Sequence, residues 1–259
     1  MVATSTHPSC PSCSEAGPRP PTRYRRADAM SIRRLLLFDI DGTLVRGGPA
    51  KTAFEEALVE TFGTTGDTEG VSFAGKTDPQ IARELLSAVG LEHREIDAGF
   101  DALWARYLGH LERRLVDRPM EVLPGVTDLL DALTSHVDVG VGLLTGNIEG
   151  GARLKLGSAS LWERFHMGSY GSDHEERDEL PAIALERAQR FWGRPVPPRE
   201  TVVIGDTPRD VQCGKKGGVR TLAVATGSYG SDELHATGAD RVIPDLASTE
   251  DVVRWLLDE

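Results

Sequence analysis

The sequence is poor in cysteine and contains no long apolar run. Its three cysteines are Cys10, Cys13 and Cys213 among 259 residues. Cys10 and Cys13 form a lone CPSC pair, and no second Cys pair or spaced His pair completes a zinc site around it. Cys213 has no partner, which favours a reducing cytoplasm. No stretch approaches the roughly eighteen consecutive apolar residues that cross a membrane, so we expect no membrane-spanning segment.

Positive charge is also in short supply. The chain carries 29 Lys and Arg residues against 40 Asp and Glu residues, a net charge of −11. Such a surface repels the phosphate backbone of nucleic acid, which argues against a general nucleic-acid binder. It also repels an anionic substrate, so a site for one requires local cations or a metal ion. The composition, 39% hydrophobic and 27% charged, is otherwise that of an ordinary globular protein.

Residues 1–30 differ from the rest of the chain. They contain five prolines, and four arginines against two acidic residues. They show no apolar periodicity and lack the apolar central region of a secretory signal. Since proline interrupts helices, we predict a disordered extension. A translation start at Met30 would leave the predicted fold intact.

Short apolar segments that end at Gly, Asp or Thr recur along the remaining chain. Near-continuous apolar strands are buried on both faces, as in a parallel sheet. The predicted strands are Leu35–Phe38, Val139–Leu144, Thr201–Ile204, Thr221–Ala225 and Arg241–Ile243, with Phe165–Tyr170 a weaker candidate. Helical patterns between them cover Gly125–Ser135, Glu149–Leu156, Leu180–Phe191, Arg209–Gly217 and Thr249–Leu257. The alternation predicts an α/β fold with a doubly wound, mainly parallel, Rossmann-like sheet.

The interval between the first two predicted strands contains no convincing strand. Its helical patterns cover Lys51–Phe62, Asp78–Val89 and Ile96–Val116. Gly and Pro residues flank it, at Gly47–Pro49 and within Arg118–Gly125. We therefore predict a core of residues 31–48 and 121–259, with an inserted α-helical cap of residues 49–120.

Polar residues follow three of the predicted strands. Asp39 and Asp41 follow the first, Thr145–Asn147 the second, and Asp206 and Asp210 a third. Ligands of open α/β sheets bind beyond the carboxyl ends of the strands, so we expect these side chains to share one site. Carboxylates that converge without a cation raise one another's pKa, and a divalent metal ion removes that cost. Oxygen ligands without His or Cys favour Mg²⁺ over Zn²⁺.

Each of these residues also has a purely local explanation. Asp-Gly is a common turn pair, which would account for Asp41. An Asp at a helix start is a common cap, and this is an equally good account of Asp210. Turns and caps do not explain why three remote segments deliver polar groups to one edge of the sheet, so we favour a functional site.

The segments DIDGTL, LLTGN and IGDTPRD, in this order and with a helical insert after the first, resemble the haloacid dehalogenase superfamily. The resemblance is to its phosphoglycolate phosphatase-like members and covers about residues 33–257. It implies a cytoplasmic, Mg²⁺-dependent phosphohydrolase that acts on a small phosphorylated metabolite through an aspartyl-phosphate. Dehalogenase members lack a carboxylate at the position of Asp41, so its presence favours a phosphatase or a phosphomutase.

The resemblance also implies roles for individual residues. Asp39 would be the nucleophile, and Asp41 the acid and base that serves first the leaving oxygen and then the attacking water. The carboxylates of Asp39 and Asp206, with the backbone carbonyl of Asp41, would hold Mg²⁺. Asp210 would coordinate the metal through water or orient a neighbouring cation. Thr145 would hold the transferring phosphoryl group. Further substrate contacts would come from Gly42, Thr43, Gly146 and Asn147.

The family has a lysine at the start of the helix before the GDxxxD strand, and this chain has none there. Arg177 occupies that position and would brace Asp39 and the phosphate through its forked donors. The alternative for Arg177 is a surface pair with Glu175 or Asp178. Lys155 is the other candidate for the lysine's role, but it lies two turns into the preceding helix, roughly 12 Å from the strand end. On that ground we favour Arg177.

Within the predicted cap, the segment FAGKTDPQIARELL opens a helix. Asp78, just before Pro79, is expected to be its N-cap, which would account for Asp78 fully. Lys76 is our candidate contact to an anionic substrate, with an exposed lysine of no function as an equal alternative. Trp104 and Tyr107, three residues apart, are expected to pack in the core rather than stack on a ligand.

Alternative functions remain open. A phosphomutase of the same superfamily would pass the phosphoryl group from Asp39 to a sugar instead of water. A phosphoaccepting signalling domain, similar to response-regulator receivers, also uses Asp and Mg²⁺ on a doubly wound sheet, but receivers are much shorter and lack a helical insert. The intact carboxylate set disfavours a silent binding scaffold. We expect a small phosphorylated metabolite as partner, no nucleic acid or membrane, and a monomer or homodimer.

Overall fold

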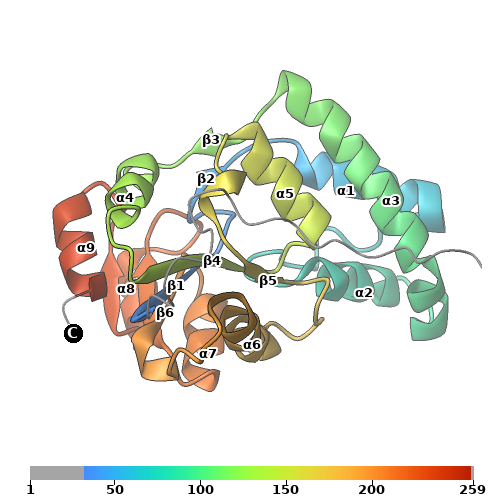
Figure 1. Ribbon diagram of the computed structural model, residues 1–259. Coiled ribbons are helices and arrows are strands. Elements are labelled where there is room, and N and C mark those ends of the chain that lie inside the picture. The colour runs from blue at the N-terminus through green and yellow to red at the C-terminus, as the bar shows by residue number, and fades with distance from the viewer. Residues whose placement is uncertain (1–31, 258–259) are drawn as a thin grey trace, which may run out of the picture.

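A parallel sheet of six strands forms the centre of the computed structural model, which describes residues 32–257 (Figure 1). The strand order is β5-β4-β1-β6-β7-β8, and every neighbouring pair is parallel. The strands are β1 (Arg34–Phe38), β4 (Val139–Thr145), β5 (Gly168–Tyr170), β6 (Thr201–Gly205), β7 (Arg220–Val224) and β8 (Arg241–Ile243). The predicted α/β fold is confirmed. The predicted extension, with Cys10 and Cys13, lies outside the described residues.

Different helices cover the two faces of the sheet. One face carries α4 (Val126–Leu133), α5 (Glu149–Ser158) and α9 (Thr249–Leu257), and the other carries α6 (Leu180–Trp192) and α7 (Pro208–Lys216) (Figure 1). Successive side chains of a strand point to opposite faces. Accordingly, Leu36 and Phe38 of β1 pack in the apolar cluster of the first face, and Leu35 and Leu37 in that of the second. All four are fully buried, which explains the unbroken apolar run.

Residues 49–120, here called the insert, contain three helices beside the sheet. They are α1 (Ala50–Phe62), α2 (Asp78–Ala88) and α3 (His93–Asp117). The chain enters the insert through β2 (Val45–Arg46) and leaves it through β3 (Glu121–Val122), and these two strands form an antiparallel pair. The apolar cluster that contains Leu36 continues into the insert through Phe54 and Leu103. Insert and sheet therefore share buried apolar surface.

Several element boundaries differ from the predictions. The weak strand candidate Phe165–Tyr170 is a strand only from Gly168, and a short 3₁₀ helix, η2 (Trp162–Arg164), precedes it. The sequence did not predict β2, β3 or α8 (Ser231–Ala236), because each is too short to show periodicity. Two further 3₁₀ helices are η3 (Arg177–Glu179) and η4 (Pro198–Glu200). None of the helices between residues 32 and 257 combines the length and the apolar character needed to cross a bilayer.

Candidate active site

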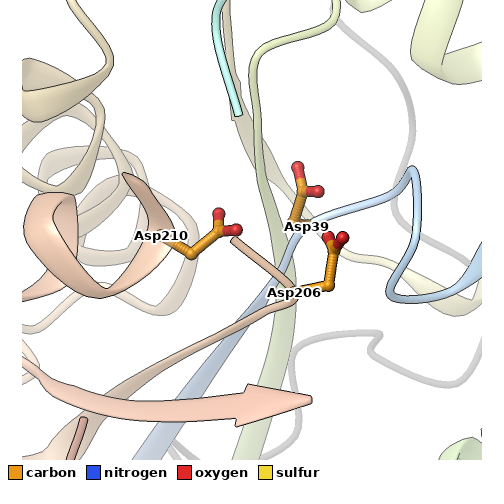
Figure 2. Close-up of side chains that lie close together, drawn as sticks. All are labelled: Asp39, Asp206 and Asp210. Carbon is orange, nitrogen blue, oxygen red and sulfur yellow. The ribbon is translucent and has the colours of Figure 1, made fainter. Parts of the chain in front are cut away.

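Three carboxylates meet at the carboxyl edge of the sheet. Asp39 follows β1, Asp206 follows β6, and Asp210 lies in the first turn of α7. Figure 2 shows the three side chains gathered in one place, and one oxygen of each lies within 4.8 Å of the others. They come together because β1 and β6 are neighbours in the sheet. All three residues are buried.

These carboxylates are costly in their ionised form. Burial raises the pKa of Asp206 to about 8, and the charges of Asp210 and Asp39 add to the effect. Burial also raises the pKa of Asp39 to about 6, although Arg177 opposes the shift. The single charge of Arg177 leaves this group of three carboxylates net negative. Clustered hard oxygen donors with a deficit of positive charge fit a divalent cation such as Mg²⁺.

Asp210 takes part in the capping box of its own helix and also pairs with the guanidinium of Arg177. Its Oδ2 accepts hydrogen bonds from the backbone N–H of Thr207 at 2.9 Å and from the Thr207 hydroxyl at 2.7 Å, which completes a capping box. Its Oδ1 accepts from the guanidinium of Arg177. The two interpretations of Asp210 are therefore compatible, since each oxygen serves a different partner.

Arg177 lies in η3 and is buried beside the carboxylates. Its Nη2 donates to Oδ1 of Asp39 at 3.0 Å and also to Asp210, and its Nη1 donates to the backbone carbonyl of Gly75 at 3.2 Å. Burial opposes the charge of Arg177, but Asp210 and Asp39 outweigh it and raise the pKa of Arg177 still further. Arg177 thus connects two carboxylates of the sheet edge with the insert.

The alternative surface pair of Arg177 with Glu175 or Asp178 does not form. Glu175 accepts two hydrogen bonds from Nε of Arg83, at 2.7 and 2.9 Å. Asp178 pairs with Lys216 at 2.6 Å. Both acids face partners other than Arg177, which turns inward.

Lys155 also reaches the site, contrary to the distance expected from the sequence. Its Nζ lies 2.6 Å from Oδ2 of Asp41 and 2.6 Å from Oδ1 of Asn147, and Lys155 is buried. The estimate of roughly 12 Å followed the helix axis and ignored the length of the side chain. Because α5 begins only at Glu149, the chain first turns at residues 146–148. The site therefore contains two buried cations.

Asn147 fixes the position of the Asp41 carboxylate together with Lys155. Its Nδ2 donates to Oδ2 of Asp41 at 2.8 Å and to the hydroxyl of Thr145 at 2.9 Å. The side chain of Asp41 is 46% exposed, whereas that of Asp39 is 7% exposed. Asp41 thus opens to solvent while Asp39 lies deeper. The group of three carboxylates that could hold a metal ion does not include the carboxylate of Asp41.

The loop after β1 packs tightly against Asp206. Gly42 has φ +83°, and a Cβ there would lie 2.4 Å from Oδ2 of Asp206, so only glycine fits. The hydroxyl of Thr43 donates to Oδ1 of Asp206 at 3.3 Å, and Thr43 is fully buried. Thr43 therefore supports Asp206 rather than lining the cavity, while Gly42 does line it.

The loop after β7 belongs to the site, although the sequence did not predict any site residue there. Thr226 donates from its hydroxyl to the carbonyl of Gly42 at 2.6 Å, and a Cβ on Gly227 would lie 1.7 Å from Oδ2 of Asp206. Both residues and Ser228 line the cavity. The rule that ligands bind at the carboxyl ends of strands, applied to β7, would have found them.

The site opens into a cavity of about 430 Å³ between the sheet edge and the insert. Asp39, Asp41, Thr145 and Gly146 line its floor, with Asn147, Lys155, Arg177 and Asp206. The insert contributes apolar and aromatic side chains and cations, namely Ala50, Phe54, Phe73, Ile81, Tyr107, Lys51 and Lys76. Tyr107 is buried against Phe54, with ring centroids 5.3 Å apart, and Trp104 stacks on Phe54 at 6.1 Å. These aromatics pack in the core as expected, and Tyr107 also faces the cavity.

Lys76 and Asp78 lie where the insert meets the sheet. Lys76 pairs with Glu84 of its own insert, and its side chain is 11% exposed. The prediction that Asp78 is the N-cap of α2 is wrong. Thr77 has the extended backbone of an N-cap and accepts from the N–H of Gln80 at 3.2 Å, so Asp78 is the first helical residue. Burial raises the pKa of Asp78 to about 6, and Lys155 opposes the shift.

The fold and the geometry at the carboxyl edge of the sheet define a doubly wound α/β protein with a polar cavity under a helical insert. A model of the family described as haloacid dehalogenase-like hydrolase matches residues 36–224. The phosphoglycolate phosphatase of Pseudomonas syringae pv. tomato is 29% identical over 227 residues, which cover 86% of this chain and 80% of that protein. The phosphoglycolate phosphatase of Rhodospirillum rubrum is 29% identical over 233 residues, which cover 86% of this chain and 90% of that protein.

Solved structures agree on the fold. A hydrolase from Pseudomonas syringae superimposes with a TM-score of 0.63 at 22% identity, covering 86% of this chain and 98% of that chain. Since the family model spans most of the chain, the protein belongs to the haloacid dehalogenase-like hydrolase family.

Proposed function

We propose that the protein is a Mg²⁺-dependent phosphomonoesterase that acts on a small phosphorylated metabolite through an aspartyl-phosphate. The observation that carries the proposal is the arrangement of two carboxylates two residues apart. Asp39 is held by Arg177, and Asp41 is held by Lys155 and Asn147. Both carboxylates line one cavity. Relatives in the same family named phosphoglycolate phosphatase support the reaction class.

In this mechanism the buried carboxylate is the nucleophile. An oxygen of Asp39 attacks phosphorus, and the bond between phosphorus and the ester oxygen breaks as Asp41 gives that oxygen a proton. Asp41, now ionised, takes a proton from water as the water oxygen attacks the phosphorus of the aspartyl-phosphate. Inorganic phosphate leaves and Asp39 is restored. The greater exposure of Asp41 suits contact with both leaving group and water.

The carboxylates of Asp39 and Asp206, with the backbone carbonyl of Asp41, would hold Mg²⁺, and Asp210 would act through Arg177 or a bridging water. When bound, the ion supplies positive charge for the phosphoryl oxygens. Thr145 would position the phosphoryl group, with backbone groups of Gly42, Gly146 and Asn147. Arg177, beside Asp39, and Lys155, beside Asp41, would neutralise negative charge at the reacting groups.

The insert would act as a cap over the leaving group, with residues 31–48 and 121–259 as the core. Lys76 and the aromatic side chains Phe54, Phe73 and Tyr107 are the part of the cavity lining that the insert would present to the leaving group. The names of the relatives make 2-phosphoglycolate the first substrate to test. Cys213 is a buried free thiol, which is compatible with a reducing cytoplasm as the compartment.

An assay with p-nitrophenyl phosphate tests the proposal. We expect hydrolysis that requires Mg²⁺ and that falls by more than about a thousandfold in Asp39→Asn. Turnover that persists in EDTA, or in Asp39→Asn, would overturn the mechanism. A screen of phosphorylated metabolites then separates phosphatase from mutase, because a mutase releases an isomeric sugar phosphate in place of inorganic phosphate.

A further inference from the structure

Asp78 contacts the sheet in a way that its own helix does not require. Thr77 already caps α2, so the carboxylate of Asp78 is free for another partner. Its Oδ2 accepts a hydrogen bond from the backbone N–H of Ile148 at 2.8 Å. Ile148 immediately precedes α5, so this carboxylate lies at the N-terminus of a helix from a different part of the chain.

A second hydrogen bond joins the same two segments. The backbone N–H of Asp78 donates to the carbonyl of Gly146 at 2.7 Å. A Cβ on Gly146 would lie 2.0 Å from the carbonyl oxygen of Lys76, so this close approach requires glycine. Asp78 therefore binds the residue before Asn147 and the residue after it.

Asn147 is the residue that links this turn to the acid–base carboxylate. Its amide nitrogen donates to Asp41 at 2.8 Å, and its amide oxygen accepts from Lys155 at 2.6 Å. Lys155 in turn donates to Asp41 at 2.6 Å. The three side chains form a closed set of hydrogen bonds, so a shift of the Asn147 backbone displaces the partners of Asp41.

We propose that Asp78 is a positioning residue for the acid–base step. It fastens the insert to the turn of residues 146–148 and so fixes Asn147 against Asp41. The carboxylate of Asp41 keeps its required orientation only while Asp78 holds this turn, which couples proton transfer to one contact of the insert. This inference rests on the proposed function, since it assigns Asp78 a part in the same reaction.

A second contact between insert and sheet provides a matched control. Arg83 of α2 donates two hydrogen bonds to Glu175, and neither of these hydrogen bonds involves the turn of residues 146–148. Arg83→Gln weakens docking of the insert and leaves the Asn147 turn intact. Asp78→Ala weakens docking and also releases the turn. Asp78→Asn retains an oxygen that can accept from Ile148.

The experiment compares phenyl phosphate with p-nitrophenyl phosphate as probes. Phenoxide is a poorer leaving group than p-nitrophenoxide and depends more on a proton from Asp41. A displacement of about 1 Å at a reacting group can cost about a hundredfold. For Asp78→Ala we expect kcat/KM to fall roughly tenfold more with phenyl phosphate than with p-nitrophenyl phosphate. Asp78→Asn should recover part of the loss, and Arg83→Gln should affect both esters equally.

Equal losses on the two esters in Asp78→Ala, or a leaving-group dependence in Arg83→Gln, would overturn the positioning role. Hydrogen exchange of residues 145–156 measures the fastening without turnover. We expect faster exchange in Asp78→Ala but not in Arg83→Gln, and unchanged exchange in Asp78→Ala would overturn the contact's role in ordering the turn. A wild-type protein that hydrolyses neither ester would overturn the proposed function and, with it, the catalytic part of this inference.

Discussion

The Nζ atom of Lys155 lies 2.6 Å from Oδ2 of Asp41. Arg177 stands in the same relation to Asp39, with its Nη2 at 3.0 Å from Oδ1. The two cations come from different elements, α5 and η3, and each neutralises one of two carboxylates that are two residues apart. Each cation can therefore be removed while the other remains.

Replacing Arg177 should cost more than replacing Lys155. Arg177→Ala leaves Asp39 and Asp210 buried without their counter-charge, which lowers the free energy of unfolding by about 3–5 kcal/mol. Activity should fall far more than in Lys155→Ala, because Asp39, the proposed nucleophile, loses its partner. Urea denaturation and steady-state kinetics measure the two effects, and Arg177→Lys controls for loss of charge. A larger loss of activity in Lys155→Ala would assign the family lysine's role to Lys155.

Mg²⁺ should stabilise the protein through Asp206. We expect the Tm of the wild type to rise with added Mg²⁺, by an amount that corresponds to about 2.7 kcal/mol at one hundred times the Kd. Asp206→Asn should show no such rise. Burial raises the pKa of Asp206 to about 8, so without metal this variant should be more stable than the wild type above about pH 8, where the substitution removes one charge from a buried group of like charges. Differential scanning fluorimetry tests both statements. A rise in Tm equal to that of the wild type would exclude Asp206 as a ligand, and Asp101→Asn, on the exposed side of α3, is the control.

Lys76 should act on the leaving group rather than on the phosphoryl group. Its ammonium lines the cavity on the side of the insert. In Lys76→Ala we expect KM for 2-phosphoglycolate, which carries a carboxylate, to rise several-fold more than KM for p-nitrophenyl phosphate. Glu84→Gln, which removes the present partner of Lys76, should not raise KM for 2-phosphoglycolate. Equal effects of Lys76→Ala on both substrates would place Lys76 outside the site.

His166 should make stability fall as the solution becomes acidic. It packs against Phe191 and Trp192, and burial lowers its pKa below the usual value near 6.5, opposed by a hydrogen bond to Val141. The unfolded chain therefore takes up a proton first as the pH falls. The contribution to stability is complete above about pH 6.5 and decreases as the pH drops toward the lowered pKa of the folded state. Urea denaturation between pH 7.5 and pH 5 should show a shallower decline in His166→Gln, and parallel curves would contradict the assignment.

The strands of the six-stranded sheet could be predicted because burial on both faces requires an unbroken run of apolar residues. Leu35 to Phe38 alternate between two apolar layers, so every position is apolar. The pair β2 and β3 has no such run. It is defined by contacts between Val45 and Val122, far apart in sequence, and each strand is too short for periodicity.

The topology of the sheet sufficed to predict which carboxylates meet at its edge. It did not suffice to predict the hydrogen-bond partners of Lys155 and Asp78. Parallel strands bring Asp39 and Asp206 together at one edge, which sequence order and apolar runs suffice to predict. The reach of Lys155 depends on where the chain turns after β4 and on the length of its side chain, and neither has a sequence signal. The partner of Asp78 is the backbone N–H of a remote loop. Every residue except proline has such a group, so the sequence does not show which one Asp78 binds.

The pairing of Arg46 with Glu121 brings the start and the end of the insert together at one place, in a two-stranded pair separate from the six-stranded sheet. A chain that passed from β2 to β3 through a tight turn would form an ordinary two-stranded hairpin in the same place. The helical unit is thus a module whose length and sequence can change while each strand keeps its neighbours. Under the proposed function, selection can remodel the surface of the insert that lines the cavity without moving Asp39 or Asp206.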